Sequence, residues 1–201
     1  MNILSIDFDI IMHPDIMLYN SMVSPDHSFN VTQDAHPLIQ FARADLTRYQ
    51  TLLSFILEVT KHLNVEDIRV GINHDDIQYF LEGQKNVHVF NVDHHHDLGY
   101  PNNNPDVCSC ANWGDFYLKR DVITHFTWIK NENSDSENGY EENDSRLTFL
   151  NYPDYNLYNL PQIDKLFLCL SPDWVPPMYH PLFFTILDLI NQQKGCRLEV
   201  H

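Results

Sequence analysis

A run of metal-binding residue types in the middle of the chain constrains the fold most, because it directly follows an apolar segment. Residues 86–92 alternate between β-branched or aromatic residues and others, which predicts a short buried strand. The run that follows is Asp93-His94-His95-His96-Asp97. In an extended chain, residues two apart share a face, so Asp93, His95 and Asp97 are expected to point the same way.

Convergence of these three side chains favours a bound divalent cation. The two carboxylates repel each other unless a cation offsets their charge. Carboxylate and imidazole ligands together suit cations of hard or borderline preference. The alternative interpretation is a polar loop with surface histidines, and the repulsion argues against it. His94 and His96 point to the opposite face, so we expect them to support the site rather than bind the cation.

A second pair of carboxylates follows the first apolar segment of the chain. Residues 3–6 have the pattern of a buried strand, and Asp7 and Asp9 come at its end. Open α/β sheets place their ligand sites at the carboxyl ends of strands. Either aspartate alone is equally typical of a helix cap or a turn. Together with the Asp93 cluster, the pair indicates a shared metal centre.

Two further strand ends carry candidate residues. Residues 68–72 predict a strand that leads to His74, and residues 165–170 predict one that leads to Asp173. A short helix separates His74 from the Asp93 cluster, so we expect the strands before these two sites to be neighbours in a βαβ unit.

Alternation of apolar strands with helices predicts the fold class. Further segments predict a strand over 122–129 and helices over 46–63 and 183–190. Continuously apolar strands between helices indicate a three-layer α/β/α domain with a mainly parallel sheet. The length of 201 residues fits a single domain over 1–201. Residues 131–145, rich in acidic side chains, are expected to form a mobile loop.

Charge and composition narrow the partners. The net charge is −16, which argues against nucleic acid, because phosphate binding needs lysine and arginine surfaces. The chain has no apolar run long enough to span a membrane and no visible signal peptide, so no membrane partner is expected. The spacing of the four cysteines matches neither a disulfide framework nor a zinc site, which favours reduced thiols in a cytoplasmic protein. The oligomeric state stays open.

The strand-end residues exceed what one cation needs. The predicted metal ligands are Asp7, Asp9, His74, Asp93, His95 and Asp97. Four carboxylates and two imidazoles fit two cations that share bridging carboxylates and activate a water molecule. Oxygen and nitrogen ligands without a thiolate favour Mn²⁺, two per chain.

Three motifs together resemble the arginase/ureohydrolase superfamily, which includes the deacetylase-like fold. Residues 93–97 resemble its Asp-x-His-x-Asp motif, residues 5–9 its Ser-x-Asp-x-Asp motif, and His74 its upstream histidine. The order is permuted, because the Asp-x-Asp motif comes first here. The small size and the Asn112-Trp113 segment resemble a divergent branch of peptide arginases, which convert arginine to ornithine in ribosomally made peptides.

The resemblance implies a role for each residue. His74, Asp93, Asp97 and Asp7 would bind one manganese, and Asp93, His95, Asp7 and Asp9 the second, with Asp93 and Asp7 bridging. The substrate would be an arginine-containing precursor peptide that releases urea. His95 and Asp173 are the candidate catalytic residues, with Asp173 holding the guanidinium, and Asn112 and Trp113 the further candidate substrate contacts. His13, His36 and His180 are candidate proton shuttles.

Other functions stay open on the sequence. A metal-dependent amidohydrolase or deacetylase would use the same metal-activated water on another C–N bond. A non-catalytic metal-binding protein would keep the centre for stability.

Overall fold

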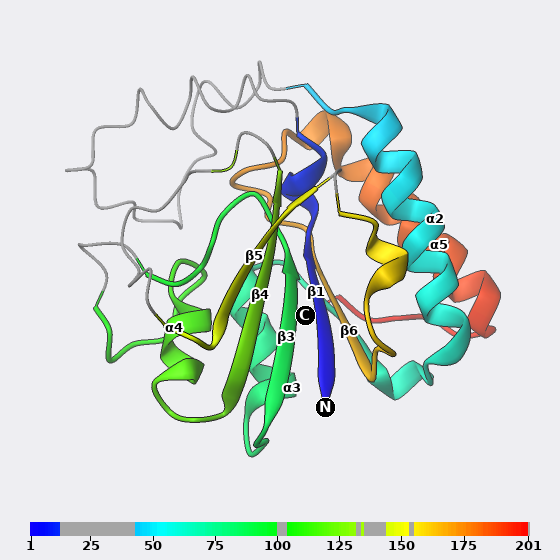
Figure 1. The fold of residues 1–201 in the computed structure, drawn as a ribbon. Helices are drawn as coiled ribbons and strands as arrows, with labels where there is room; N and C mark the ends of the chain where they lie inside the picture. Colours follow the sequence, from blue (N-terminus) through cyan, green and yellow to red (C-terminus); the bar gives the residue numbers. More distant parts are fainter. Residues whose placement is uncertain (13–42, 100–103, 132–133, 135–143, 153–154, 201) are drawn as a thin grey trace.

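The computed structural model describes residues 1–12, 43–99, 104–131, 134, 144–152 and 155–200 (Figure 1). Its centre is one sheet of six strands, all parallel, in the order β2-β6-β1-β3-β4-β5. The strands are β1 Asn2–Asp7, β2 Ile68–Gly71, β3 Val87–Val92, β4 Ile123–Asn131, β5 Leu147–Tyr152 and β6 Lys165–Cys169. The predicted α/β class with a parallel sheet is confirmed.

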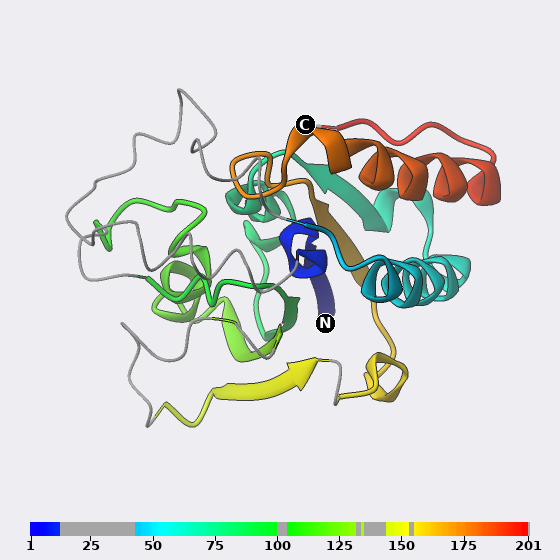
Figure 2. The same cartoon turned by 90° about the horizontal axis from the view of Figure 1, so that it is seen from above.

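Helices cover both faces of this sheet. On one face lie α2 Leu46–His62 and α5 His180–Lys194; on the other lie α3 Gln78–Leu81 and α4 Trp113–Leu118 (Figures 1 and 2). Strand β6 shows the division, since Leu166 and Leu168 belong to the first apolar core and Phe167 to the second. Alternate residues of a strand point to opposite faces, so one strand supplies both cores. The three-layer prediction is confirmed.

Short 3₁₀ turns complete the described elements, and two of them position candidate ligands. They are η1 Phe8–Ile11, η3 Val65–Asp67, η4 His74–Ile77, η5 Leu157–Asn159 and η6 Pro177–Tyr179. Turn η1 begins directly after β1, and η4 follows β2 by two residues.

Local sequence explains the two long helices. Helix α2 begins where the Asp45 carboxylate accepts hydrogen bonds from the backbone N–H groups of Thr47 and Arg48. Its buried residues recur at helical spacing and face the core. Helix α5 ends at Gly195, whose φ of +64° is the left-handed conformation common at helix ends. Neither these helices nor any other described helix is long and apolar enough to cross a membrane.

The expected pairing of the strands before His74 and Asp93 is wrong. Strand β2 pairs with β6, and both β6 and β1 separate β2 from β3. Strand β6 buries its apolar residues on both faces, whereas β2 exposes Arg69. A strand that is buried on both faces suits the centre of a sheet. Strand β6 accordingly lies between β1 and β2, and β2 lies at the edge.

The adjacent strands β1 and β3 mark the place where the chain changes sides of the sheet. Helix α2 follows β1 on one face, and α4 follows β3 on the other. Connections that diverge in this way open a crevice at the carboxyl ends of the strands. Asp7 and Asp93 lie at these two carboxyl ends.

Candidate metal centre

Asp7 and Asp9 lie where β1 turns into η1. The Asp7 Oδ1 atom accepts a hydrogen bond from the backbone N–H of Asp9 (3.2 Å), which caps the turn. The Ser171 hydroxyl donates to Asp7 Oδ2 at 2.5 Å. Both aspartates are buried. Asp7 therefore caps the turn, as an aspartate commonly does, but it is also buried beside other charged side chains.

His74 brings an imidazole into the same place from β2. Its Nδ1 atom lies 3.1 Å from Asp7 Oδ2, 3.1 Å from Asp93 Oδ2 and 2.8 Å from Asp97 Oδ2. Its Nε2 atom is hydrogen-bonded to the Ser5 hydroxyl at 2.6 Å. One ring nitrogen is therefore fixed by a hydroxyl, and the other faces three carboxylate oxygens.

The position of His74 depends on close packing of the backbone before it against Asp76 and Phe167. The Asp76 carboxylate accepts hydrogen bonds from the backbone N–H groups of Ile72 and Asn73. A Cβ atom at Gly71 would lie 2.8 Å from Asp76 Cβ and 2.7 Å from the Phe167 ring. Only glycine at position 71 allows this packing, and the His74 ring then stacks on Phe167.

A second group of ligands forms around His95. Its Nδ1 atom lies 2.9 Å from Asp9 Oδ2 and 4.0 Å from Asp93 Oδ1. The backbone N–H of His95 donates to Asp93 Oδ1 at 2.8 Å. The ring lies 4.4 Å from the Trp174 ring, measured between centroids.

Asp93 belongs to both groups, and its two oxygens face different ways. Its Oδ2 atom faces His74 and accepts a hydrogen bond from the Asn91 amide, whereas Oδ1 faces His95. Asp7, His74 and Asp93 form one cluster of potential ligand atoms, and Asp9, Asp93 and His95 form the other. The six predicted ligands are thus brought together, with Asp97 joined to the first cluster through His74. Asp7 is grouped with the first cluster, and its bridging of two cations stays a prediction.

The loop after β3 reaches this arrangement by a turn and not by the extended chain expected from the sequence. Asp97 has a φ of +53°, the left-handed region, and strand β3 ends at Val92. The turn is held by α4, since the Gly114 N–H donates to the Asp97 carbonyl (3.0 Å) and the Trp113 indole donates to Asp97 Oδ2 (2.7 Å).

One nitrogen of each of the rings of His94 and His96 is held by a hydrogen bond outside the two clusters. The Nδ1 atom of His94 is hydrogen-bonded to the Asn131 amide (3.1 Å), and Nδ1 of His96 accepts from the backbone N–H of Leu98 (2.9 Å). Both rings are buried. They anchor the loop that carries Asp93 and His95.

The candidate substrate contacts Asn112 and Trp113 have internal roles in the structure. Trp113 is fully buried, and its indole supports Asp97 as described above. The Asn112 amide donates to the carbonyls of Asn104 and Val107, and its oxygen accepts from Ser109. Trp113 holds the candidate ligand Asp97 in place, and Asn112 holds the loop before α4. Both side chains are buried, so neither is open to a substrate.

Asp173 lies between two residues that contact the centre. Ser171 donates to Asp7, and Trp174 packs on His95. Partial burial raises the pKa of the Asp173 carboxyl. Of the candidate proton shuttles, His180 is hydrogen-bonded to the Val175 carbonyl, and His13 and His36 lie outside the described residues, as does most of the acidic segment 131–145.

Comparison with family profiles, curated protein sequences and solved structures found no match to this chain.

Without a cation, the buried charges favour the protonated forms of Asp9, Asp93 and His95. Burial and the neighbouring carboxylates Asp7 and Asp93 raise the pKa of Asp9 to about 8, and burial together with Asp97 and Asp7 raises that of Asp93 to about 7. Burial lowers the pKa of both His74 and His95, but the facing carboxylates outweigh it, so the pKa of His95 rises to about 9.

The donor set fits a pair of divalent cations. Buried atoms without a hydrogen-bond partner include His74 Nδ1 in the first cluster and Asp9 Oδ2 in the second. Buried polar atoms are otherwise almost always hydrogen-bonded, so orphaned atoms beside facing carboxylates need another partner. His74 and Asp7, Asp93 and Asp97 would hold one cation, and His95, Asp9 and Asp93 the other. The hydrogen bond between His74 Nε2 and the Ser5 hydroxyl is of the kind that metal-binding histidines usually make with their second ring nitrogen.

Proposed function

We propose that this chain is a dinuclear, manganese-dependent hydrolase of guanidino groups that acts on arginine side chains of a peptide in the cytoplasm and releases urea. The observation that carries the proposal is Asp93, whose two oxygens face two separate ligand clusters. A shared carboxylate between two clusters is the arrangement of two-cation hydrolases. The resemblance to the arginase superfamily in three motifs supports the guanidino substrate.

The loop after β6 supports a cationic substrate. Trp174 lies against His95, and Asp173 precedes it with a partly buried carboxylate. A carboxylate can hold a guanidinium through two parallel hydrogen bonds, and an indole face attracts it. The net charge of −16 would draw a basic peptide toward the protein.

The reaction that this assignment requires is balanced by water alone. Water attacks the guanidinium carbon, the bond from that carbon to the side-chain nitrogen breaks, and the amine of ornithine leaves with a proton, which gives urea. When bound, two divalent cations supply a water of lowered pKa and neutralise developing negative charge. The hydrogen bonds within the site hold the cation-binding atoms in place. Asp173 binds the guanidinium and so positions its carbon for attack.

Urea release tests the proposal directly. Protein loaded with Mn²⁺ is incubated with an arginine-containing peptide or with free L-arginine, and urea and the peptide mass are measured. We expect urea and an ornithine-containing product from the peptide, and little from free arginine. Asp93→Asn should abolish release, whereas Asp188→Asn, an exposed aspartate on α5, should leave it unchanged.

Two results would contradict parts of this assignment. Comparable turnover of free arginine and peptide would exclude the peptide preference. Absence of urea from both substrates, with two cations bound, would leave the centre but assign it to another C–N bond, as in the amidohydrolase alternative.

A further inference from the structure

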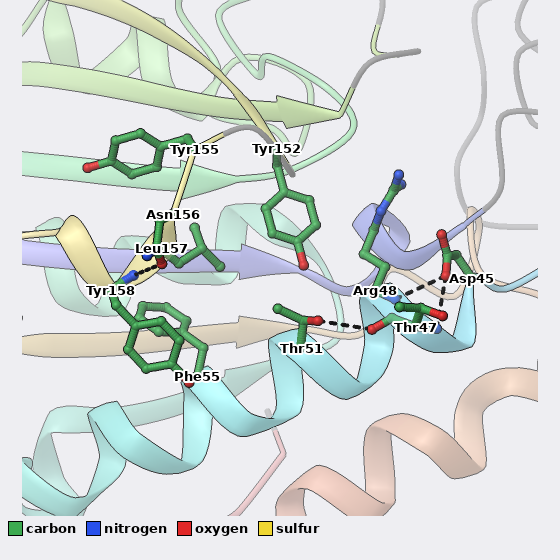
Figure 3. A pocket seen from close by; sticks show the side chains of 10 residues that line it. All are labelled: Asp45, Thr47, Arg48, Thr51, Phe55, Tyr152, Tyr155, Asn156, Leu157 and Tyr158. Carbon is green, nitrogen blue, oxygen red and sulfur yellow. Dashed lines mark hydrogen bonds between the residues drawn. The ribbon is translucent and has the colours of Figure 1, made fainter.

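A pocket lies between α2 and the segment that follows β5. Its volume is about 240 Å³. Figure 3 shows its walls, which come from Asp45 and the first part of α2 on one side and from Tyr152 and residues 155–158 on the other. The lining residues are Asp45, Thr47, Arg48, Thr51, Phe55, Tyr152 and the run from Tyr155 to Tyr158.

Arg48 is the unusual member of this lining. It is only 7% exposed, although arginine is almost never buried without a charged partner. Its Nη1 donates to the Ile10 carbonyl (3.1 Å), and its guanidinium carbon lies 5.7 Å from the centre of the Tyr152 ring. Among the described residues, none of the ion pairs of the structure includes Arg48, and the Ile10 carbonyl is the acceptor of its side-chain hydrogen bond.

The guanidinium can take a further partner. It carries five N–H donors and cannot lose its charge. One of its nitrogens donates to the Ile10 carbonyl, and in the described part of the chain no Arg48 nitrogen is among the buried atoms that lack a hydrogen-bond partner, so the other donors are open to an acceptor in the adjoining pocket. The Ile10 carbonyl fixes the guanidinium in place, so an acceptor that enters the pocket meets a donor that is already oriented.

The other residues that line the pocket indicate what kind of molecule fits it. Phe55, Leu157 and Tyr158 supply apolar and aromatic surface, and Phe55 packs edge-on against Tyr158 at 5.4 Å between centroids. Asp45 also lines the pocket, but its carboxylate already caps α2 through the N–H groups of Thr47 and Arg48. A single guanidinium beside that carboxylate suits one negative charge and not the two of a phosphate.

We propose that this pocket binds a small monocarboxylic acid with an aromatic or branched apolar body, whose carboxylate pairs with Arg48. At the space of about 30 Å³ that one water takes in the liquid, the volume equals that of about eight water molecules. The pocket adjoins the turn η1 that carries Asp9, since Arg48 donates to the Ile10 carbonyl, but its ligand takes no part in the reaction proposed for the metal centre.

Two matched probes test this proposal. 3-Phenylpropionate and its neutral amide, 3-phenylpropanamide, are titrated separately into the isotope-labelled full chain, with backbone amide shifts followed by NMR. We expect saturable shifts at Thr51 and Leu157 from the acid, and at least tenfold weaker binding of the amide. The titration is repeated with chelator, because a carboxylate bound at the metal centre would then be released, whereas binding at Arg48 would persist.

Variants separate the pocket from the fold. Arg48→Met should weaken acid binding at least tenfold, and Arg69→Met, which removes an exposed arginine from β2, should not change it. Thr51→Phe, at an exposed position of the wall, should block the pocket while leaving Arg48 in place, which keeps the test valid if Arg48→Met does not fold. Equal binding of acid and amide, binding unaffected by Thr51→Phe, or no saturable shift up to about 10 mM acid would each overturn the proposal.

Discussion

At the scale of single residues, the centre depends on hydrogen bonds that decide which ligand atom faces the cation. The carboxylates and imidazoles themselves could be predicted from the sequence, because each follows an apolar strand. Their supports could not. Ser5 lies in a strand, and only the approach of β2 from across β6 makes it the partner of His74 Nε2. Trp113 was expected to contact substrate, yet its indole N–H reaches Asp97.

Ser5→Ala tests the support of His74. Loss of the hydroxyl leaves Nε2 without its partner and frees the ring tautomer, so we expect affinity for Mn²⁺ to fall about 10- to 100-fold, the range for such outer hydrogen bonds. Isothermal titration with Mn²⁺ measures the change. Ser54→Ala, at an exposed serine that bonds within α2, is the matched control and should bind as the unchanged protein does. Equal affinity in both variants would refute the role of Ser5.

The raised pKa values predict how pH affects the cation-free protein. The folded state holds protons on Asp9 and Asp93, with pKa values of about 8 and about 7, where the unfolded chain has already lost them. The pKa of about 9 for His95 acts in the same direction above its ordinary value of about 6.5. The folded state therefore binds more protons than the unfolded state between pH 6 and 8, and stability falls as pH rises.

A divalent cation displaces these protons, so the stabilisation by Mn²⁺ should grow over the same interval. Thermal unfolding at pH 6, 7 and 8, with chelator and with Mn²⁺, measures both effects. A gain in Tm from Mn²⁺ that is constant or shrinks toward pH 8 would count against these carboxylates as ligands.

At the scale of elements, the position of α4 against the loop after β3 sets the geometry of Asp97. A Cβ atom at Gly114 would lie 2.9 Å from the Phe126 ring and 3.0 Å from the Asp97 carbonyl oxygen. The sequence could not predict this contact, because it depends on how α4 packs against the Asp97 loop. The strands other than β5 and the two long helices were predicted because their patterns are local. The neighbours of β2 were not, because pairing with β6 joins segments far apart in the chain.

Gly114→Ala should push α4 away from the Asp97 loop. We expect a loss of about 1–3 kcal/mol in stability, as for other overpacked cores, and weaker Mn²⁺ binding. Gly195→Ala is the control. Alanine at the φ of +64° found at position 195 lowers stability, but this position lies at the end of α5, far along the chain from the candidate ligands. A Cβ atom there would have no other atom within 4 Å. Denaturant unfolding and Mn²⁺ titration of both variants separate the effects. Weakened binding in both would show that stability alone, and not the α4 contact, controls the site.

At the scale of the whole molecule, the parallel sheet gathers residues from four separate strand ends into one buried, acidic place. The class of the fold determines this, since the carboxyl ends of parallel strands lie at the same edge. Sequence patterns predicted that these residues come together, whereas the place of Asp93 in both clusters depends on side-chain directions. In a chain of net charge −16, the two proposed cations would also relieve repulsion within the core.

Metal content is the measurement that tests the dinuclear centre most directly. Protein loaded with Mn²⁺ and freed of excess by gel filtration is analysed for manganese per chain, together with His95→Ala and with His62→Ala, an exposed histidine of α2, as the control. The account predicts two manganese ions in the unchanged protein and in His62→Ala, and one in His95→Ala, because His74 still serves the first cluster. A single ion in the unchanged protein, or two in His95→Ala, would contradict it.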